Sequence, residues 1–252
     1  MATNPITGGA TIKLRLMPVD ILALAAHRDD VEQTCAGTLL KMAERGHSTG
    51  ILDLTRGEMG TRGSMEDRAH EAAEAARILQ VSWRQALDIP DGRVENNWEN
   101  RLKVARVLRE QRPRVLILPY WEGRHPDHYT ASTLGYEAAF LSGLSKLPVE
   151  GSAHRPFKII YASLYRDVRP TFVVDITDQF ERRFESLMAY KTQFSDQHAG
   201  SGIFPGQQEI RARVESMARF YGALGGITYA EPFFQKEVGL VDDVLALPVK
   251  SI

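Results

Sequence analysis

The chain has 252 residues, of which 43% are hydrophobic and 25% charged. These proportions are typical of a soluble globular protein with one substantial core, and we expect a single domain over residues 1–252. Its 31 basic and 32 acidic side chains nearly cancel, which gives no indication of binding to nucleic acid or an anionic membrane. With one cysteine, Cys35, neither an internal disulfide nor a cysteine-based zinc site can form.

The first eighteen residues lack the apolar stretch of a secretory signal, and no later segment approaches a membrane span. We therefore expect a cytoplasmic protein.

Apolar runs alternate with amphipathic patterns through the first half of the chain. This alternation predicts an α/β fold, a Rossmann-like doubly wound and mainly parallel sheet with helices on both faces. Strand order 3-2-1-4-5 would make the first and fourth strands neighbours. Strands are expected at residues 19–26, 48–54, 83–89 and 114–120, and helices at 31–45, 65–79, 96–112 and 129–144.

The order changes after the last of these helical segments. Residues 158–165 and 171–177 have strand patterns joined by a turn around Pro170, and residues 179–193 and 207–224 have helical patterns. We therefore expect a C-terminal strand and helix extension of the same domain, ending in a peripheral tail. The glycines at 57, 60 and 63 follow the second strand rather than the first, so they do not form a dinucleotide fingerprint, and Asp53 is expected to be structural.

Two acidic-histidine clusters follow the first and fourth predicted strands. They are His27-Arg28-Asp29-Asp30 and His125-Pro126-Asp127-His128. In a doubly wound sheet the loops leaving two such strands open into one crevice, which is the usual ligand site. The two clusters are therefore expected to meet in space.

The residue types in these clusters suit a catalytic metal. A catalytic zinc takes three protein ligands and leaves one position open, and His27, Asp30 and His128 can supply the three. Two histidines and one carboxylate also suit ferrous iron. Taken singly, a histidine near a loop end is more often structural and an aspartate there more often caps a helix, but the joint pattern favours a metal site.

Three further side chains of the clusters suit hydrolysis. Asp29 is placed to accept a proton from metal-bound water, whose pKa the ion lowers to roughly 7. His125, when protonated, would stabilise an oxyanion or protonate a leaving amine. Asp127 would orient the His125 imidazole and favour its charged form. The clusters together predict a hydrolytic centre for an amide or an ester.

These motifs resemble those of the LmbE-like or PIG-L-type zinc-dependent N-acetylglucosaminide deacetylases. The family hallmarks are Ala-His-Pro-Asp-Asp and His-Pro-Asp-His, and here they read Ala26-His27-Arg28-Asp29-Asp30 and His125-Pro126-Asp127-His128. The resemblance implies a single LmbE-like domain, zinc on the three ligands named above, Asp29 as general base and His125 as acid or oxyanion stabiliser. Arg28 replaces the usual proline; its side chain could add a positive group at the rim of the site, but we expect it to be exposed to solvent.

Within that family the chain is most similar to the bacillithiol-pathway deacetylases, which implies N-acetylglucosaminyl-malate as substrate. The guanidinium groups of Arg56, Arg62 and Arg124 suit the two carboxylates of malate, although each could instead pair with a surface acid. Gln193 is a further candidate substrate contact.

Two other functions stay open. One is deacetylation of another N-acetyl sugar conjugate, such as a mycothiol-type substrate, and the other is metal-dependent sugar binding without turnover. Exposed apolar positions on the predicted C-terminal helices favour a homo-oligomer.

Overall fold

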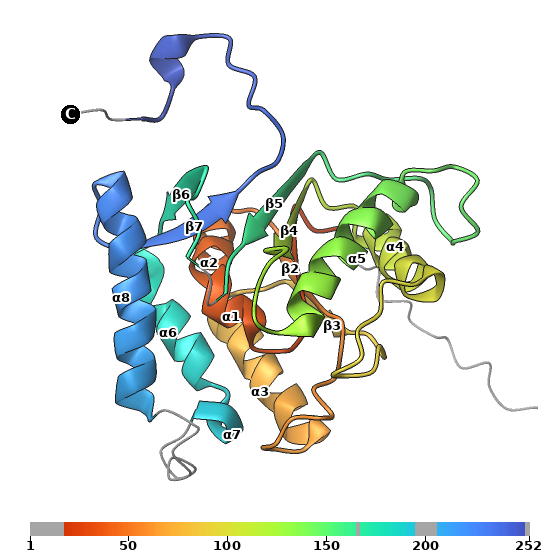
Figure 1. The fold of residues 1–252 in the computed structure, drawn as a ribbon, viewed down its shortest axis with the longest axis horizontal. Coiled ribbons are helices and arrows are strands. Elements are labelled where there is room, and N and C mark those ends of the chain that lie inside the picture. Colours follow the sequence, from red (N-terminus) through yellow and green to blue (C-terminus); the bar gives the residue numbers. More distant parts are fainter. Residues whose placement is uncertain (1–17, 165–166, 195–205, 250–252) are drawn as a thin grey trace, which may run out of the picture.

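The computed structural model describes residues 18–164, 167–194 and 206–249. Seven strands form one sheet in the order β3-β2-β1-β4-β5-β7-β6 (Figure 1). The strands are β1 (Ile21–Ala25), β2 (Thr49–Asp53), β3 (Trp83–Ala86), β4 (Val115–Pro119), β5 (Lys158–Ala162), β6 (Phe172–Asp175) and β7 (Ala230–Phe234). The first five are parallel, which confirms the predicted order 3-2-1-4-5 and the α/β fold.

Strand β1 lies at the centre of the parallel part and is covered on both faces. Its residue Ile21 pairs with Thr49 of β2 on one side and with Val115 of β4 on the other. Leu22 and Leu24 belong to a core shared with helices α4 (Trp98–Gln111) and α5 (Pro126–Ser142). Ala23 alternates to the opposite face, because successive side chains of a strand point to opposite sides, and lies with α1 (Asp30–Thr34) and α2 (Ala36–Glu44).

The helix predicted over residues 31–45 is in fact two helices. The backbone leaves the helical region at Cys35, where φ is −141° and ψ is 15°. The break frees the amides of Gly37 and Thr38, which donate to the carboxylate of Glu231 at 2.9 and 2.7 Å. A buried carboxylate needs such donors, and the amino end of a helix supplies them.

The helix predicted over residues 65–79 is α3 (Met65–Ile78), and Ser64 caps it as expected. The Ser64 side chain accepts a hydrogen bond from the backbone amide of Asp67, and the Asp67 side chain accepts one from the backbone amide of Ser64.

The C-terminal part contains a strand that the sequence did not reveal. β7 runs antiparallel between β5 and β6, so the two predicted strands around Pro170 are not neighbours. Pro232 and Glu231 within β7 hide its strand pattern, because both are depleted in strands. The helix predicted over 179–193 is divided into η1 (Thr177–Gln179), α6 (Phe180–Met188) and α7 (Lys191–Phe194), and α8 (Gln207–Gly225) lies beside β7.

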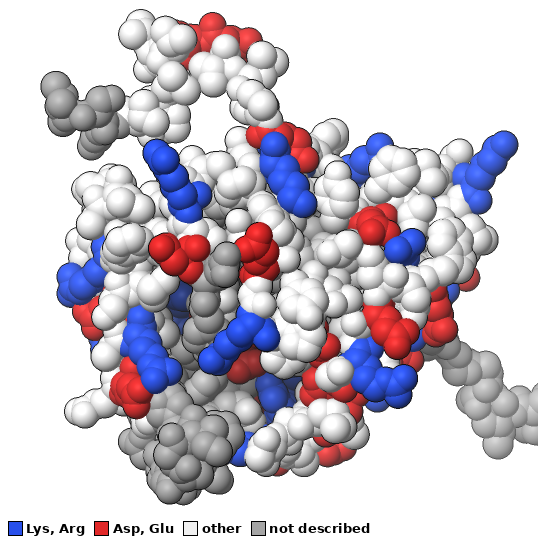
Figure 2. All heavy atoms as spheres, in the orientation of Figure 1, with Lys and Arg blue, Asp and Glu red and all other residues white. Residues whose placement is uncertain are grey.

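After β7 the chain leaves the body of the molecule and ends in a peripheral segment with the short helix η3 (Val244–Ala246) (Figure 1). Among the described residues, no helix combines the length and the apolar character needed to cross a membrane. On the face shown in Figure 2, basic and acidic side chains are interspersed.

Candidate metal centre and active site

The two clusters meet at the carboxyl ends of β1 and β4. The first occupies the turn between β1 and α1, and the second forms the start of α5. Helix α5 begins at Pro126, three residues earlier than predicted, so His125 is its N-cap and His128 lies in its first turn. Proline suits the first helical position because its missing N–H has no helical partner there.

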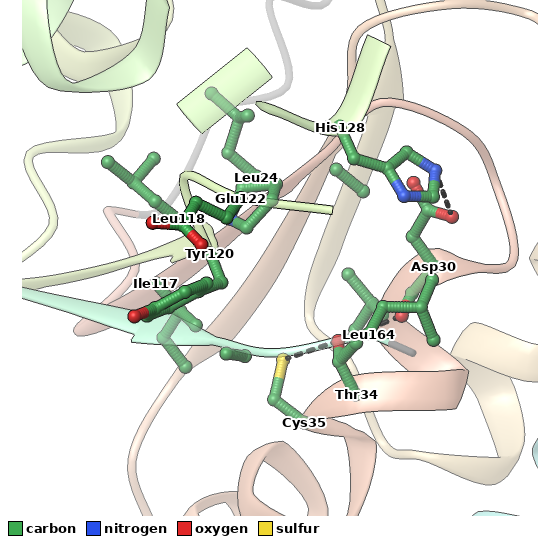
Figure 3. A pocket seen from close by; sticks show the side chains of 14 residues that line it. Leu24, Asp30, Thr34, Cys35, Ile117, Leu118, Tyr120, Glu122, His128 and Leu164 are labelled. Carbon is green, nitrogen blue, oxygen red and sulfur yellow. Dashed lines mark hydrogen bonds and ion pairs between the residues drawn. The ribbon is translucent and has the colours of Figure 1, made fainter. Parts of the chain in front are cut away.

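Three of the predicted site residues bring their ligand atoms together, as Figure 3 shows for two of them. His27 Nδ1 lies 3.2 Å from His128 Nε2, and His128 Nε2 lies 3.2 Å from Asp30 Oδ1. His27 Nδ1 lies 3.6 Å from Asp30 Oδ2. Tetrahedral zinc with bonds of about 2.0–2.1 Å sets its ligands about 3.3 Å apart. The donor set and its spacing therefore fit a divalent metal.

Three carboxylates surround the His27 ring and favour a positive charge there. Its Nε2 faces Asp91 Oδ1 at 3.1 Å and Asp127 Oδ2 at 3.3 Å, while Nδ1 faces Asp30. Burial by itself lowers the pKa of His27, but the hydrogen bonds that its ring donates to Asp127, Asp30 and Asp91 outweigh burial and raise that pKa to about 12. A bound cation would likewise balance the negative charge of these three carboxylates.

Asp127 contacts His125 through its backbone amide, whereas its carboxylate is directed at His27. Its carboxylate accepts from the backbone amides of Gly92 at 2.8 Å and Val94 at 3.2 Å, and it faces His27. A carboxylate on the second nitrogen of a metal-binding histidine fixes the tautomer and the ring orientation. The structure therefore places Asp127 behind His27.

Asp91 also faces Nε2 of His27, and the sequence analysis did not identify it as a site residue. Its Oδ2 accepts from the amide of Met59 at 3.0 Å, which leaves Oδ1 directed at His27. The signal for it was its place after β3, whose carboxyl end lies at the same edge of the sheet as those of β1 and β4.

His125 packs its ring against the rings of His27 and His128. The ring stacks on His128 with centroids 4.8 Å apart and meets His27 edge-on at 4.8 Å. Its Nδ1 accepts from the backbone amide of Asp127 at 3.2 Å. Burial, followed by the charges of His27 and His128, lowers the pKa of His125; the negative charge of Asp127 favours the charged imidazole, as expected, but does not offset them.

Asp29 lies beside the triad and is held by Arg68 of α3. Asp29 Oδ1 is 3.2 Å from an Arg68 guanidinium nitrogen, and Gln33 donates to Oδ2 at 3.3 Å. Burial raises the pKa of Asp29, and the positive charge of Arg68 opposes that rise. Gly57 packs against Arg68, where an added Cβ would lie 3.1 Å from its Nε, and its φ of +74° also favours glycine. Sequence reasoning missed Arg68, which sits within a helical pattern without a motif.

Arg28 is buried, so the expectation of an exposed side chain is wrong. Only 8% of its surface is accessible, and its guanidinium donates to the carbonyl of Met65 at 2.9 Å. Its own carbonyl accepts from Arg84 and from the hydroxyl of Tyr190. Arg84 also pairs with Asp53 at 2.9 Å, in agreement with the structural role expected for that acid.

The four predicted substrate contacts are dispersed. Arg56 is exposed on the loop after β2. Arg62 donates to the carbonyl of Gln193 at 3.2 Å, and the Gln193 amide donates back to the Arg62 carbonyl at 2.7 Å. Arg124 and Gln193 both line a large groove beside α8, whereas Arg56 and Arg62 are not among its lining residues.

One protein family matches the segment of the chain that contains both clusters. The family described as PIG-L: GlcNAc-PI de-N-acetylase matches residues 22–139. An uncharacterized deacetylase, YaiS, from Escherichia coli is 30% identical over 46% of this chain and 72% of its own. The chain belongs to the PIG-L family.

Two further relatives match over most of the chain. A diacetylchitobiose deacetylase from Thermococcus kodakarensis is 29% identical over 84% of this chain and 80% of its own. The crystal structure of the conserved protein TT1542 from Thermus thermophilus is 40% identical, with a TM-score of 0.81 over 89% of this chain and 98% of that one. The fold of this PIG-L member therefore extends beyond the segment that the family description matches.

Proposed function

We propose that this PIG-L protein is a metal-dependent amide hydrolase that removes the acetyl group from an N-acetylglucosaminide. The observation that carries the proposal is the convergence of His27, Asp30 and His128 within the spacing of a metal site, with Asp29 and His125 beside it. The diacetylchitobiose deacetylase similarity supports an N-acetylated sugar as substrate.

The ligand triad would hold the ion, which we propose to be zinc. Such an ion supplies Lewis acidity, lowering the pKa of water and polarising an amide carbonyl. Asp91 and Asp127 would hold the His27 ring in orientation by accepting from its Nε2.

Asp29 is the proposed base. Its carboxylate is not a member of the triad, and the ion pair with Arg68 leaves it oriented beside Asp30. It would take a proton from the attacking water as the carbon–oxygen bond forms. The carbon–nitrogen bond then breaks, the proton passes to the departing nitrogen, and a free amine and acetate result.

His125 is the proposed hydrogen-bond donor to the substrate. Because its Nδ1 accepts from the Asp127 amide, a neutral ring carries its proton on Nε2. That nitrogen is the one that can donate to the oxyanion or to the leaving amine.

The finer proposal is that the substrate is N-acetylglucosaminyl-malate of bacillithiol synthesis. It is supported by Arg124 and Gln193, which both line the groove beside α8. Release of primary amine from this compound should exceed release from free N-acetylglucosamine and from an inositol-linked analogue. Equal rates on all three would reject the malate assignment but keep the deacetylase.

The decisive test of the deacetylase is the Asp29→Asn variant. Loss of the base should lower turnover by about 10²–10⁴-fold while metal content stays near that of the wild type. The matched control is Asp242→Asn, an exposed acid in the peripheral C-terminal segment, which should behave like the wild type. Amine release that is absent from the metal-loaded wild type on every N-acetyl sugar would reject the enzyme and favour metal-dependent sugar binding.

A further inference from the structure

A small cavity lies against two of the proposed metal ligands. It sits between the carboxyl ends of β1, β4 and β5, and Asp30 and His128 form one side of it (Figure 3). Ile117, Leu118 and Tyr120 lie across from them in the same view. Val31, Thr34, Cys35 and Leu164 complete most of the wall.

The cavity has room for one small group. Its volume is about 20 Å³, and about 10–15 Å³ measured in this way is enough for a single water molecule. A sugar ring cannot enter such a space. Besides the two ligands, the polar side chains of Thr34 and Glu122 line it, and Thr34 Oγ1 donates to the carbonyl of Asp30 at 2.8 Å. Most of the remaining wall is aliphatic or aromatic.

We propose that this cavity is the acyl pocket of the enzyme and that it restricts the substrate to N-acetyl groups. The inference rests on the proposed function and deepens it. An amide carbonyl carbon carries two substituents, here a methyl group and the nitrogen of a sugar. Next to the proposed metal ligands only the methyl group fits the small, mainly apolar cavity, so the sugar must lie on the open, polar side.

Leu164 is the proposed specificity-determining residue. Together with Thr34 it lines both this cavity and the groove beside α8, whose volume is about 990 Å³. The leucine side chain therefore separates a space for one methyl group from a space for a long chain. It is partly buried, just beyond the end of β5, where truncation disturbs little of the core.

The test compares acyl chain lengths on one sugar. Rates are measured on N-acetyl-, N-propionyl- and N-butyrylglucosaminyl-malate and on the three N-acylglucosamines. The wild type should prefer acetyl over propionyl by about tenfold or more in kcat/KM, since one methylene in an apolar pocket changes kcat/KM by about 10–200-fold. Leu164→Ala should raise the butyryl-to-acetyl ratio by about tenfold or more. Leu224→Ala, an exposed leucine of α8, should leave it unchanged.

A wild type that hydrolyses all three acyl groups equally would overturn the proposal, as would a folded Leu164→Ala variant with an unchanged acyl ratio. If Leu164→Ala does not fold, Ile117→Val deepens the same cavity by one methyl group and should raise the propionyl-to-acetyl ratio. An unchanged ratio in that variant would likewise overturn the proposal.

Failure of the proposed function gives a separate result, namely no amine from any acyl sugar. The pocket is then tested by thermal stabilisation of zinc-loaded wild type with acetate and with butyrate. Acetate should raise Tm more than butyrate, and Leu164→Ala should remove the difference. Equal stabilisation by both carboxylates in the wild type would overturn the acyl pocket.

Discussion

The two sides of the crevice between β1 and β4 differ in the chemical character of their side chains. Toward β2 and β3 lie ion pairs and carboxylates, namely Asp29 with Arg68 and the two acids behind His27. Toward β4 and β5 lies the small cavity with its largely aliphatic and aromatic wall. Buried charges are costly unless every partner is in place, whereas an apolar wall is constrained by shape alone. The charged side is therefore expected to tolerate substitution less well.

The charged side continues into the core beneath the first cluster. Arg84 contacts Glu32 at 2.7 Å and Asp53 at 2.9 Å, and it also donates to the carbonyl of Arg28. Burial raises the pKa of Glu32 to about 7 despite the guanidinium beside it. The turn that carries His27, Asp29 and Asp30 thus rests on a buried polar network rather than on packing alone.

The largest effect is expected from His128, which belongs to both sides. It is one of the three proposed ligands and also lines the small cavity. His128→Ala should lower kcat/KM by about a thousandfold or more and remove bound metal, because several kcal/mol of Lewis-acid stabilisation are lost. The measurements are turnover and metal content per chain, with the exposed His47→Ala as control. A variant that keeps one metal per chain and near-wild-type turnover would contradict the assigned ligand.

An intermediate effect is expected from Asp91, which lies only on the charged side. Asp91→Asn should weaken metal affinity or activity by about 10- to 100-fold, because the carboxylate behind a metal-binding histidine raises its basicity. Metal affinity is measured by competition with a chelator. Asp88→Asn, an acid paired with Lys103 on the surface, is the matched control. Equal affinities for the two variants would show that Asp91 has no part in holding His27.

The charged side should also make the metal-free protein sensitive to pH. The pKa of His27 is raised from 6.5 to about 12, so its stabilising contribution is complete below about pH 6.5 and is lost as the pH rises toward 12. The free energy of unfolding of chelator-treated protein should fall between pH 7 and 9 by up to about 1.4 kcal/mol per pH unit. Denaturant unfolding measures it. Leu164→Ala should keep this slope and His27→Gln should lose it; a metal-free wild type that gains stability over this range would contradict the sign.

The sequence predicted the apolar strands and the meeting of His27, Asp30 and His128, but not the residues that support them. The runs leading to His27 and His125 are long and apolar, and a doubly wound sheet brings their ends together whatever the intervening helices do. Arg68 and Arg84 reach the site from α3 and β3, and their placement depends on tertiary packing that no local pattern records. The same holds for Arg28, whose burial requires the carbonyl of Met65 as a partner.

The smallest effect is expected from Tyr190, at the base of the charged side. Its side chain is fully buried, and its hydroxyl donates to the carbonyl of Arg28 and lies 3.2 Å from Glu32 Oε1. Tyr190→Phe should lower the free energy of unfolding by about 1 kcal/mol, the usual net contribution of one hydrogen bond. Arg84 still donates to the Arg28 carbonyl, so the turn and the metal content should persist. Unfolding of the metal-loaded variant and wild type measures the difference, with Tyr129→Phe, an exposed tyrosine of α5, as control. A Tyr190→Phe variant that loses its metal would show that the turn depends on this one donor, and the network beneath the charged side would then be no more robust than the ligands above it.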